Sequence, residues 1–149
     1  NLERLAAAVQ QLPEPLPLIV AGASGWGEVN VEGDVRFLGF VADADLSALY
    51  AAAAVFCYPS LREGFGLPVL EAMAQGTPVV TSRGTSTEEV AGGAAVLVNP
   101  TDITDIARGV ADALRDSDRL AVAGRARAAS MTWQHTAELT VAAYREVAP

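Results

Sequence analysis

The chain has 149 residues, of which 51% are hydrophobic and 19% charged, a length and composition typical of one packed globular domain and not of a disordered chain. Its 18 acidic and 10 basic residues give a formal net charge of −8, which argues against nucleic acid and anionic membrane surfaces as partners. No apolar run reaches the roughly 20 residues of a membrane helix, and the first residues do not resemble a signal peptide. We therefore expect no membrane span and a cytoplasmic protein.

Hydrophobic spacing and turn residues predict strands that alternate with helices. Strands are predicted at 16–21, 35–38, 54–58, 78–81 and 94–98. Helices are predicted at 2–12, from Asp43 or Asp45 to about Ala53, at 68–75, at 88–91, and from about 102 onward with breaks near 117 and 131–132. Either Asp43 or Asp45 can cap the second of these helices. The nearly continuous apolar run at 16–21 is typical of a strand buried on both faces. This alternation predicts an α/β fold with a doubly wound, Rossmann-like parallel sheet, in which ligands bind at the carboxyl ends of the strands.

The most informative segment is Ser60–Glu71, which joins the end of a predicted strand to the start of a predicted helix. Gly64 and Gly66 allow backbone to approach a ligand closely, and Pro68 suits the first helical position. The free amides of the first helical turn then point back into the loop, where the helix dipole also favours an anion. The segment therefore predicts a phosphate cradle, even though the domain as a whole is acidic.

Two carboxylates flank this cradle, at Glu63 in the loop and at Glu71 about one turn inside the helix. A carboxylate accepts hydrogen bonds from vicinal hydroxyls, so Glu71 could hold a ribose while Glu63 faces a sugar at the other end of a diphosphate. The spacing also fits a second interpretation, in which Glu71 is only a favourable anion near a helix start and Glu63 a solvated loop charge.

Several stretches of the sequence resemble the group 1 retaining glycosyltransferases of the two-domain GT-B kind. The resemblance is carried by Tyr58-Pro59-Ser60, Glu63-Gly64-Phe65-Gly66-Leu67-Pro68, Leu70-Glu71-Ala72-Met73, Gly76-Thr77-Pro78-Val79-Val80, Phe37-Leu38-Gly39-Phe40-Val41, Ala94–Pro100, Thr132-Trp133 and Tyr144-Arg145-Glu146. It covers nearly the whole chain except the glycine-rich loop at Gly22–Gly33.

The resemblance implies a role for each matching position. Glu63 would be the catalytic residue, contacting the donor sugar and supporting charge at the anomeric carbon, while Glu71 would hold the nucleotide ribose. The remaining donor-binding positions that it implies are Gly64, Phe65, Gly66 and Leu67 for sugar hydroxyls and phosphate, Gly39, Phe40 and Val41 beside the base, and Thr85 and Ser86 for a phosphate or sugar contact. The implied donor is a nucleoside-diphosphate sugar, with no metal and no other cofactor. The acceptor would attack on the face that the diphosphate leaves.

The sequence also departs from the family pattern. The family's arginine and lysine for the diphosphate come from a strand and turn before the position of Asn1, and that segment is absent. We therefore expect residues 1–149 to be a donor-binding domain whose first strand and N-terminal acceptor domain are missing, and which is inactive alone. Asp is common in the family where Ala54 stands, and the usual Leu-Pro-Glu-Val becomes Thr87-Glu88-Glu89-Val90.

Other features favour structural roles over chemical ones. Asp43-Ala44-Asp45 mimics a metal-binding acidic pair, but its place at a helix start favours capping, and one His and one Cys cannot assemble a metal site here. Gly22, Gly25 and Gly27 lack the spacing of a dinucleotide fingerprint, which favours a plain loop. We expect Cys57 to pack as a small hydrophobe, and His135 and the arginines of the last helices, Arg119, Arg125 and Arg127, to lie on solvated surfaces.

Two rival functions remain open at this point. A sugar-nucleotide epimerase of related architecture would need acid/base residues that the Glu63–Glu71 segment does not show. A non-catalytic domain that binds a nucleotide or serves as a scaffold is the second alternative, and loss of nucleotide affinity on a Glu71→Ala change would discriminate against the scaffold.

Overall fold

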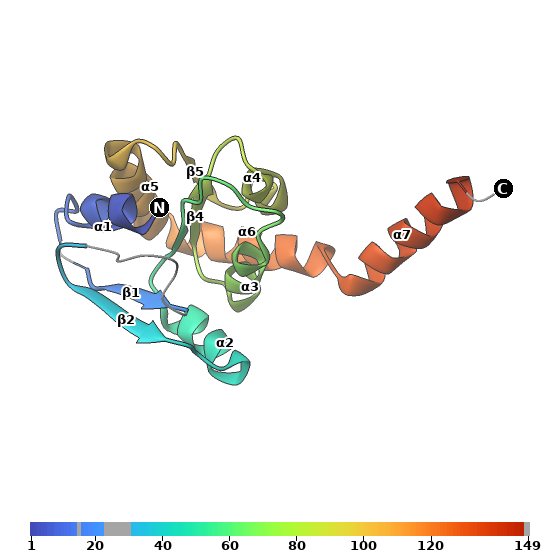
Figure 1. Cartoon of the computed structure of the whole chain (residues 1–149), viewed down its shortest axis with the longest axis horizontal. Helices are drawn as coiled ribbons and strands as arrows, with labels where there is room; N and C mark the ends of the chain where they lie inside the picture. The colour runs from blue at the N-terminus through green and yellow to red at the C-terminus, as the bar shows by residue number, and fades with distance from the viewer. Residues whose placement is uncertain (15, 23–30, 148–149) are drawn as a thin grey trace.

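The computed structural model describes residues 1–14, 16–22 and 31–147. Its helices are α1 (Leu2–Val9), α2 (Asp43–Ala52), α3 (Leu67–Gln75), α4 (Ser86–Ala91), α5 (Ile103–Arg115), α6 (Ser117–Ser130) and α7 (Trp133–Val147). Its strands are β1 (Leu18–Ala21), β2 (Val35–Gly39), β3 (Phe56–Tyr58), β4 (Val79–Ser82) and β5 (Val96–Val98). Every predicted element is present and in the predicted order, and the breaks between the last three helices fall where the sequence places them (Figure 1).

Some boundaries differ from the prediction for local reasons. α1 ends at Val9, because Gln11 and Leu12 donate to carbonyls three residues back and continue the chain as a tight turn. The expected cap of α2 was wrong: Ala42 is the N-cap residue, no side chain caps it, and Asp43 and Asp45 lie in the first turn. In this first turn, both carboxylates stabilise the helix through its dipole and not as caps.

All strand pairs are parallel, but the described strands form two sheets rather than one. One sheet contains β1 and β2, and the other has the order β3-β4-β5, with Cys57 beside Val80 and Val80 beside Val96. The parallel strands and the helices between them agree with the predicted doubly wound, Rossmann-like α/β fold. Figure 1 shows the β1–β2 pair beside the other sheet rather than within it.

Adjacent residues of β4 face two different hydrophobic cores. Val80 packs with α1 and α5, in a cluster that includes Leu5, Val98 and Ile106. Val79 belongs to a second cluster, formed with the buried side chains of α3 and α4 and with Tyr50 of α2. Because consecutive side chains of a strand point to opposite faces, helices cover both faces of this sheet, as a doubly wound fold requires.

β1 is not buried on both faces, which corrects the prediction. Leu18 and Val20 are half-buried, whereas Ile19 is 40% exposed and Ala21 is also exposed. The apolar run gave a wrong prediction of burial because β1 packs toward the core of α1 and α5 through one set of alternate residues only.

The two last helices behave differently. α6 packs along α3, with Leu120 in one core and Ala123 beside the other. α7 has no buried residue and extends away from the rest of the chain (Figure 1). Within residues 1–14, 16–22 and 31–147, no helix combines the length and the apolar character that a bilayer crossing demands.

Candidate functional site

The loop between β3 and α3 has the backbone shape that the sequence predicts. Gly66 is the N-cap residue of α3 and has a left-handed backbone, with φ of +110°. α3 begins at Leu67, so Pro68 is its second residue, one position later than predicted. Pro68 still suits this place because the amide that it lacks belongs to the first helical turn, where no intrahelical acceptor exists.

The backbone amides of residues 64–67 are free donors among the described residues. Among the described residues, none of these four amides donates to a backbone or side-chain acceptor, whereas the next free amide, that of Val69, donates to the Gly66 carbonyl over 3.0 Å. Phe65 and Leu67 are 46% and 43% exposed and Gly64 is also exposed, whereas Gly66 between them is buried. Free donors at a helix N-terminus favour an anion.

Glu63 is half-buried and held from two sides. The Ser60 hydroxyl donates to Glu63 Oε1 over 2.9 Å, and the Ser86 hydroxyl donates to the Glu63 carbonyl oxygen over 3.0 Å. Burial, together with a hydrogen bond to the Glu63 carboxylate, raises the pKa of Tyr58 to about 12, so that phenol stays protonated at neutral pH. Glu63 is therefore an oriented carboxylate and not a freely solvated loop charge.

A network of buried hydroxyls ties this loop to the turn between β4 and α4. The Thr81 hydroxyl contacts the Thr87 hydroxyl at 2.7 Å and the Tyr58 carbonyl at 3.0 Å. The Ser82 hydroxyl donates to the Ser60 carbonyl over 2.6 Å. Because the bonds from Thr81 and Ser82 to the Tyr58 and Ser60 carbonyls join residues 23 and 22 positions apart, they fix the loop on the carboxyl end of the β3–β4 pair.

Glu71 lies on the exposed side of α3, as its fifth residue. Its Oε2 accepts a hydrogen bond from the Tyr50 hydroxyl over 3.0 Å. Burial and the Glu71 carboxylate raise the pKa of Tyr50, so the hydroxyl remains a donor. Tyr50, Tyr58 and Thr87 were not among the site residues predicted from the sequence.

The other predicted donor-binding positions fall in two turns. Gly39, with φ of +69°, ends β2, and Phe40 after it is 83% exposed. Val41 is half-buried and leads into α2, the helix that carries Tyr50. Thr85 is the N-cap residue of α4 but makes no side-chain capping bond, and its hydroxyl contacts the Thr87 hydroxyl at 2.8 Å. The hydroxyls of Thr85 and Ser86 are thus both engaged within the protein.

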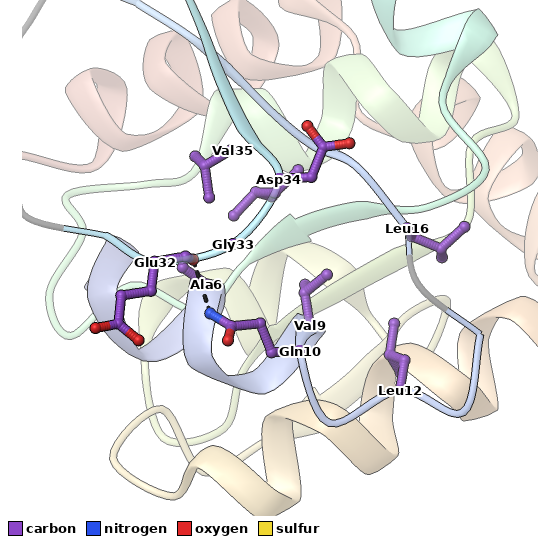
Figure 2. Close-up of a pocket in the computed structure, with 10 residues that line it drawn as sticks. Ala6, Val9, Gln10, Leu12, Leu16, Glu32, Gly33, Asp34 and Val35 are labelled. Carbon is purple, nitrogen blue, oxygen red and sulfur yellow. Dashed lines mark hydrogen bonds between the residues drawn. The ribbon is translucent and has the colours of Figure 1, made fainter.

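A cavity of about 300 Å³ lies elsewhere, between α1 and the amino ends of β1 and β2 (Figure 2). Its walls are mostly apolar, and the Gln10 side chain crosses its edge to donate to the Glu32 carbonyl over 2.7 Å. Glu32 and Asp34 add carboxylates to its lining, which disfavours a diphosphate. No predicted site residue lines it, so we do not assign the donor to this cavity.

The structure also bears on the metal-binding, histidine and arginine predictions made from the sequence. Asp43 and Asp45 are exposed, and the described residues contain no group of three or more His, Cys, Asp or Glu side chains placed to hold a metal. His135 is exposed on α7, as expected. Gly25 and Gly27 of the alternative dinucleotide motif lie outside the described residues. Arg127 is not solvated, which corrects the expectation: it is half-buried, and its guanidinium donates to two carbonyls at the end of α4.

Comparison with known proteins gives consistent matches. The sequence model described as "Glycosyl transferases group 1" matches residues 1–129. The chain is 40% identical to O-antigen chain mannosyltransferase B of Escherichia coli over 97% of its own length and 42% of that protein. It is 41% identical to the MMP alpha-(1->4)-mannosyltransferase of Mycolicibacterium hassiacum over 80% of its length and 31% of that protein. The chain thus spans less than half the length of these relatives.

Solved structures of whole enzymes contain the same fold. Sucrose-phosphate synthase from Thermosynechococcus elongatus superposes with a TM-score of 0.81 and 29% identity, over 97% of this chain and 41% of that one. HepE from Anabaena, in complex with UDP and glucose, superposes with a TM-score of 0.79 and 25% identity, over 96% of this chain and 44% of that one. The described fold is therefore that of a GT-B Rossmann-like domain.

Proposed function

Because this chain belongs to the group 1 glycosyl transferases, we propose that it is the donor-binding domain of a retaining hexosyltransferase that uses a nucleoside-diphosphate sugar. The single observation that supports this most strongly is the Gly64–Leu67 turn, whose free amides lie between two oriented carboxylates, Glu63 and Glu71. A relative of the same fold, HepE, binds UDP and glucose. The mannosyltransferases among the relatives support a hexose as the transferred sugar.

The proposed roles follow from charge. The amides of residues 64–67 receive sugar hydroxyls and phosphate, and Glu71 accepts hydrogen bonds from the ribose hydroxyls. When the glycosyl–phosphate bond breaks, positive charge develops at the anomeric carbon and negative charge on the leaving diphosphate. The Glu63 carboxylate stabilises the positive charge at the anomeric carbon, and the N-terminus of α3 stabilises the negative charge on the diphosphate. The acceptor hydroxyl attacks on the face that the diphosphate leaves, and a phosphate oxygen takes its proton.

Other positions complete the proposed pocket. Gly39, Phe40 and Val41 border the base, and the exposed ring of Phe40 offers an apolar surface for it. The turn at Thr85 and Ser86 lies against Glu63 through the Ser86 hydroxyl, which brings its backbone close to the sugar end of the pocket.

We also propose that a strand outside this sequence completes the sheet. β1 and β3 each pair on one side only among the described strands, yet Leu18 and Cys57 pack against the same core. The Asn1 side chain donates to the carbonyls of Pro59 and Pro100 over 2.7 Å each, so α1 begins at the edge where β3 and β5 end. A strand that leads into α1 would therefore end at this edge and run parallel to β3. With α1 as its right-handed crossover to β1, that strand would fill the place between β1 and β3.

The same upstream region would carry the acceptor domain and the diphosphate's missing cations. The share of the relatives that the chain covers, 42% of the E. coli mannosyltransferase, is consistent with one half of a two-domain enzyme. The isolated domain would then bind donors weakly and not turn over.

Calorimetry with UDP, GDP and their sugars tests this proposal. We expect saturable, base-selective binding, weak for this chain and tighter for the complete protein. Glu71→Ala should weaken nucleotide binding in both, and unchanged affinity would favour the scaffold alternative. No binding of any of these nucleotides at millimolar concentration would refute the proposed pocket.

A further inference from the structure

The Glu71 carboxylate has one protein partner among the described residues, the Tyr50 hydroxyl. Glu71 is an exposed side chain on a helix surface, where a glutamate normally samples several rotamers. Tyr50 is only 8% exposed and reaches Oε2 from α2, at 3.0 Å. A buried, fixed donor therefore holds an exposed, flexible acceptor.

Tyr50 is itself fixed at both ends. Its ring packs edge-on against Phe56 of β3, with centroids 5.2 Å apart and planes at 88°. Its backbone carbonyl accepts a hydrogen bond from the Thr77 hydroxyl over 2.6 Å, and Thr77 lies just before β4. The position of the Tyr50 hydroxyl is thus set by the sheet and not by the surface of α2.

The same row of rings leads to Glu63. Phe56 stacks on Tyr58, with centroids 5.7 Å apart and planes at 18°, and the Tyr58 phenol lies beside the Glu63 carboxylate. The two candidate carboxylates are therefore held at opposite ends of one packed aromatic row, formed by Tyr50, Phe56 and Tyr58. This gives their separation a rigid basis that the exposed loop between them does not provide.

We propose that Tyr50 is a positioning residue for nucleotide binding, whose hydroxyl fixes one oxygen of Glu71 so that the other faces the bound nucleotide. The inference rests on the proposed function, in which Glu71 holds the ribose. Its effect is preorganisation: the rotamer freedom of Glu71 is lost on folding, so less remains to be lost on binding. Removing the hydroxyl should weaken nucleotide binding about threefold to tenfold, the range expected for one side chain that must be ordered again.

The test uses the complete protein, with UDP and GDP as probes. Tyr50→Phe keeps the ring contact with Phe56 and removes only the donor, and Ser47→Ala removes an exposed hydroxyl from the same helix, α2. We expect the dissociation constant from calorimetry and the KM for the donor to rise together for Tyr50→Phe. We expect kcat to stay within about twofold, and Ser47→Ala to match the wild type.

A double-mutant comparison separates positioning from a general structural effect. In a Glu71→Ala background the carboxylate is gone, so Tyr50→Phe should cause no further loss of nucleotide affinity. An equal further loss in that background would overturn the inference, as would unchanged affinity in the single variant. Either result leaves the proposed function intact as long as the wild type binds a nucleotide. If the wild type binds neither UDP nor GDP, both proposals fail.

Discussion

Arg127 connects the surface of α6 to the short helix that supports the candidate site. Its Nε and Nη2 donate to the carbonyls of Val90 and Glu89, each over 2.8 Å. These carbonyls lie in the last turn of α4, where a cation also interacts favourably with the helix dipole. The first residue of α4 is Ser86, whose hydroxyl donates to the Glu63 carbonyl. Arg127 therefore fixes the C-terminal end of the same helix that holds the Glu63 backbone at its N-terminal end.

We expect Arg127→Ala to lower the free energy of unfolding by about 1–3 kcal/mol, because the carbonyls of Val90 and Glu89 lose a charged donor and the bond to Val90 is partly buried. Arg119 provides the matched control: it lies on the same helix, 64% exposed, and pairs only with Asp116 at 3.4 Å. Arg119→Ala should change stability by no more than about 0.5 kcal/mol. Urea denaturation measures both, and equal losses would contradict the capping role of Arg127.

Cys57 should be an unreactive thiol. Burial raises its pKa to about 12, and the side chain packs against the core of α1 and α5. Because the raised pKa favours the protonated form, the thiolate fraction at pH 8 falls about 10³-fold below that of an ordinary thiol. Iodoacetamide should alkylate the native protein far more slowly than the urea-unfolded protein. Comparable rates in the two states would show that Cys57 is accessible.

The turn before α3 requires glycine at position 66 but not at position 64. Gly66 has φ of +110°, and a Cβ there would meet Thr87 Cγ2 at 2.8 Å, whereas a Cβ at Gly64 would meet nothing within 4 Å. The left-handed backbone alone disfavours Ala by about 1–2 kcal/mol, and the contact with Thr87 adds to it. Gly66→Ala should therefore lower the melting temperature clearly, while Gly64→Ala should leave it nearly unchanged. Similar melting temperatures for the two variants would mean that the turn adapts.

Local patterns predicted the elements and the shape of this loop because their causes are local. Apolar spacing gave the helices, and Gly66 and Pro68 gave the turn and the start of α3. The hydrogen bonds from Tyr50 to Glu71 and from Ser86 to Glu63 could not be predicted the same way, because these residues meet only after the chain has folded. A buried hydroxyl that bonds to a carbonyl 20 or more residues away leaves no periodic signal in the sequence.

Other misjudgements have physical causes of the same kind. Arg127 was predicted to be solvated because its hydrogen-bond acceptors are backbone carbonyls, which every residue carries and which therefore leave no signal in the sequence. β1 looked fully buried because an apolar run does not reveal whether a second layer covers it. In the structure Ile19 of β1 is 40% exposed.

At the scale of the whole molecule, α7 is an amphipathic helix without a partner. Trp133, Ala137 and Tyr144 lie on one face at helical spacing, while Gln134 and Glu138 lie on a polar side about 100° further around the helix and bond to each other over 3.0 Å. Trp133 and Tyr144 are 77% and 68% exposed, which is costly for rings in water. A lone helix of this length is also marginal without tertiary packing. We therefore expect the part of the protein outside this sequence to cover this face.

Trp133 reports directly on this expectation. In a Trp26→Phe background it is the only tryptophan, and acrylamide should quench its fluorescence strongly in the 149-residue chain. In the complete protein the Trp133 signal is obtained as the difference from a Trp133→Phe variant, and we expect much weaker quenching and emission at shorter wavelength, because an apolar partner surface removes the ring from water. Glu138→Gln, on the polar side, should leave both signals unchanged. Equal quenching of Trp133 in the two proteins would show that α7 stays uncovered, and would remove one support for a second domain seated against this end of the chain.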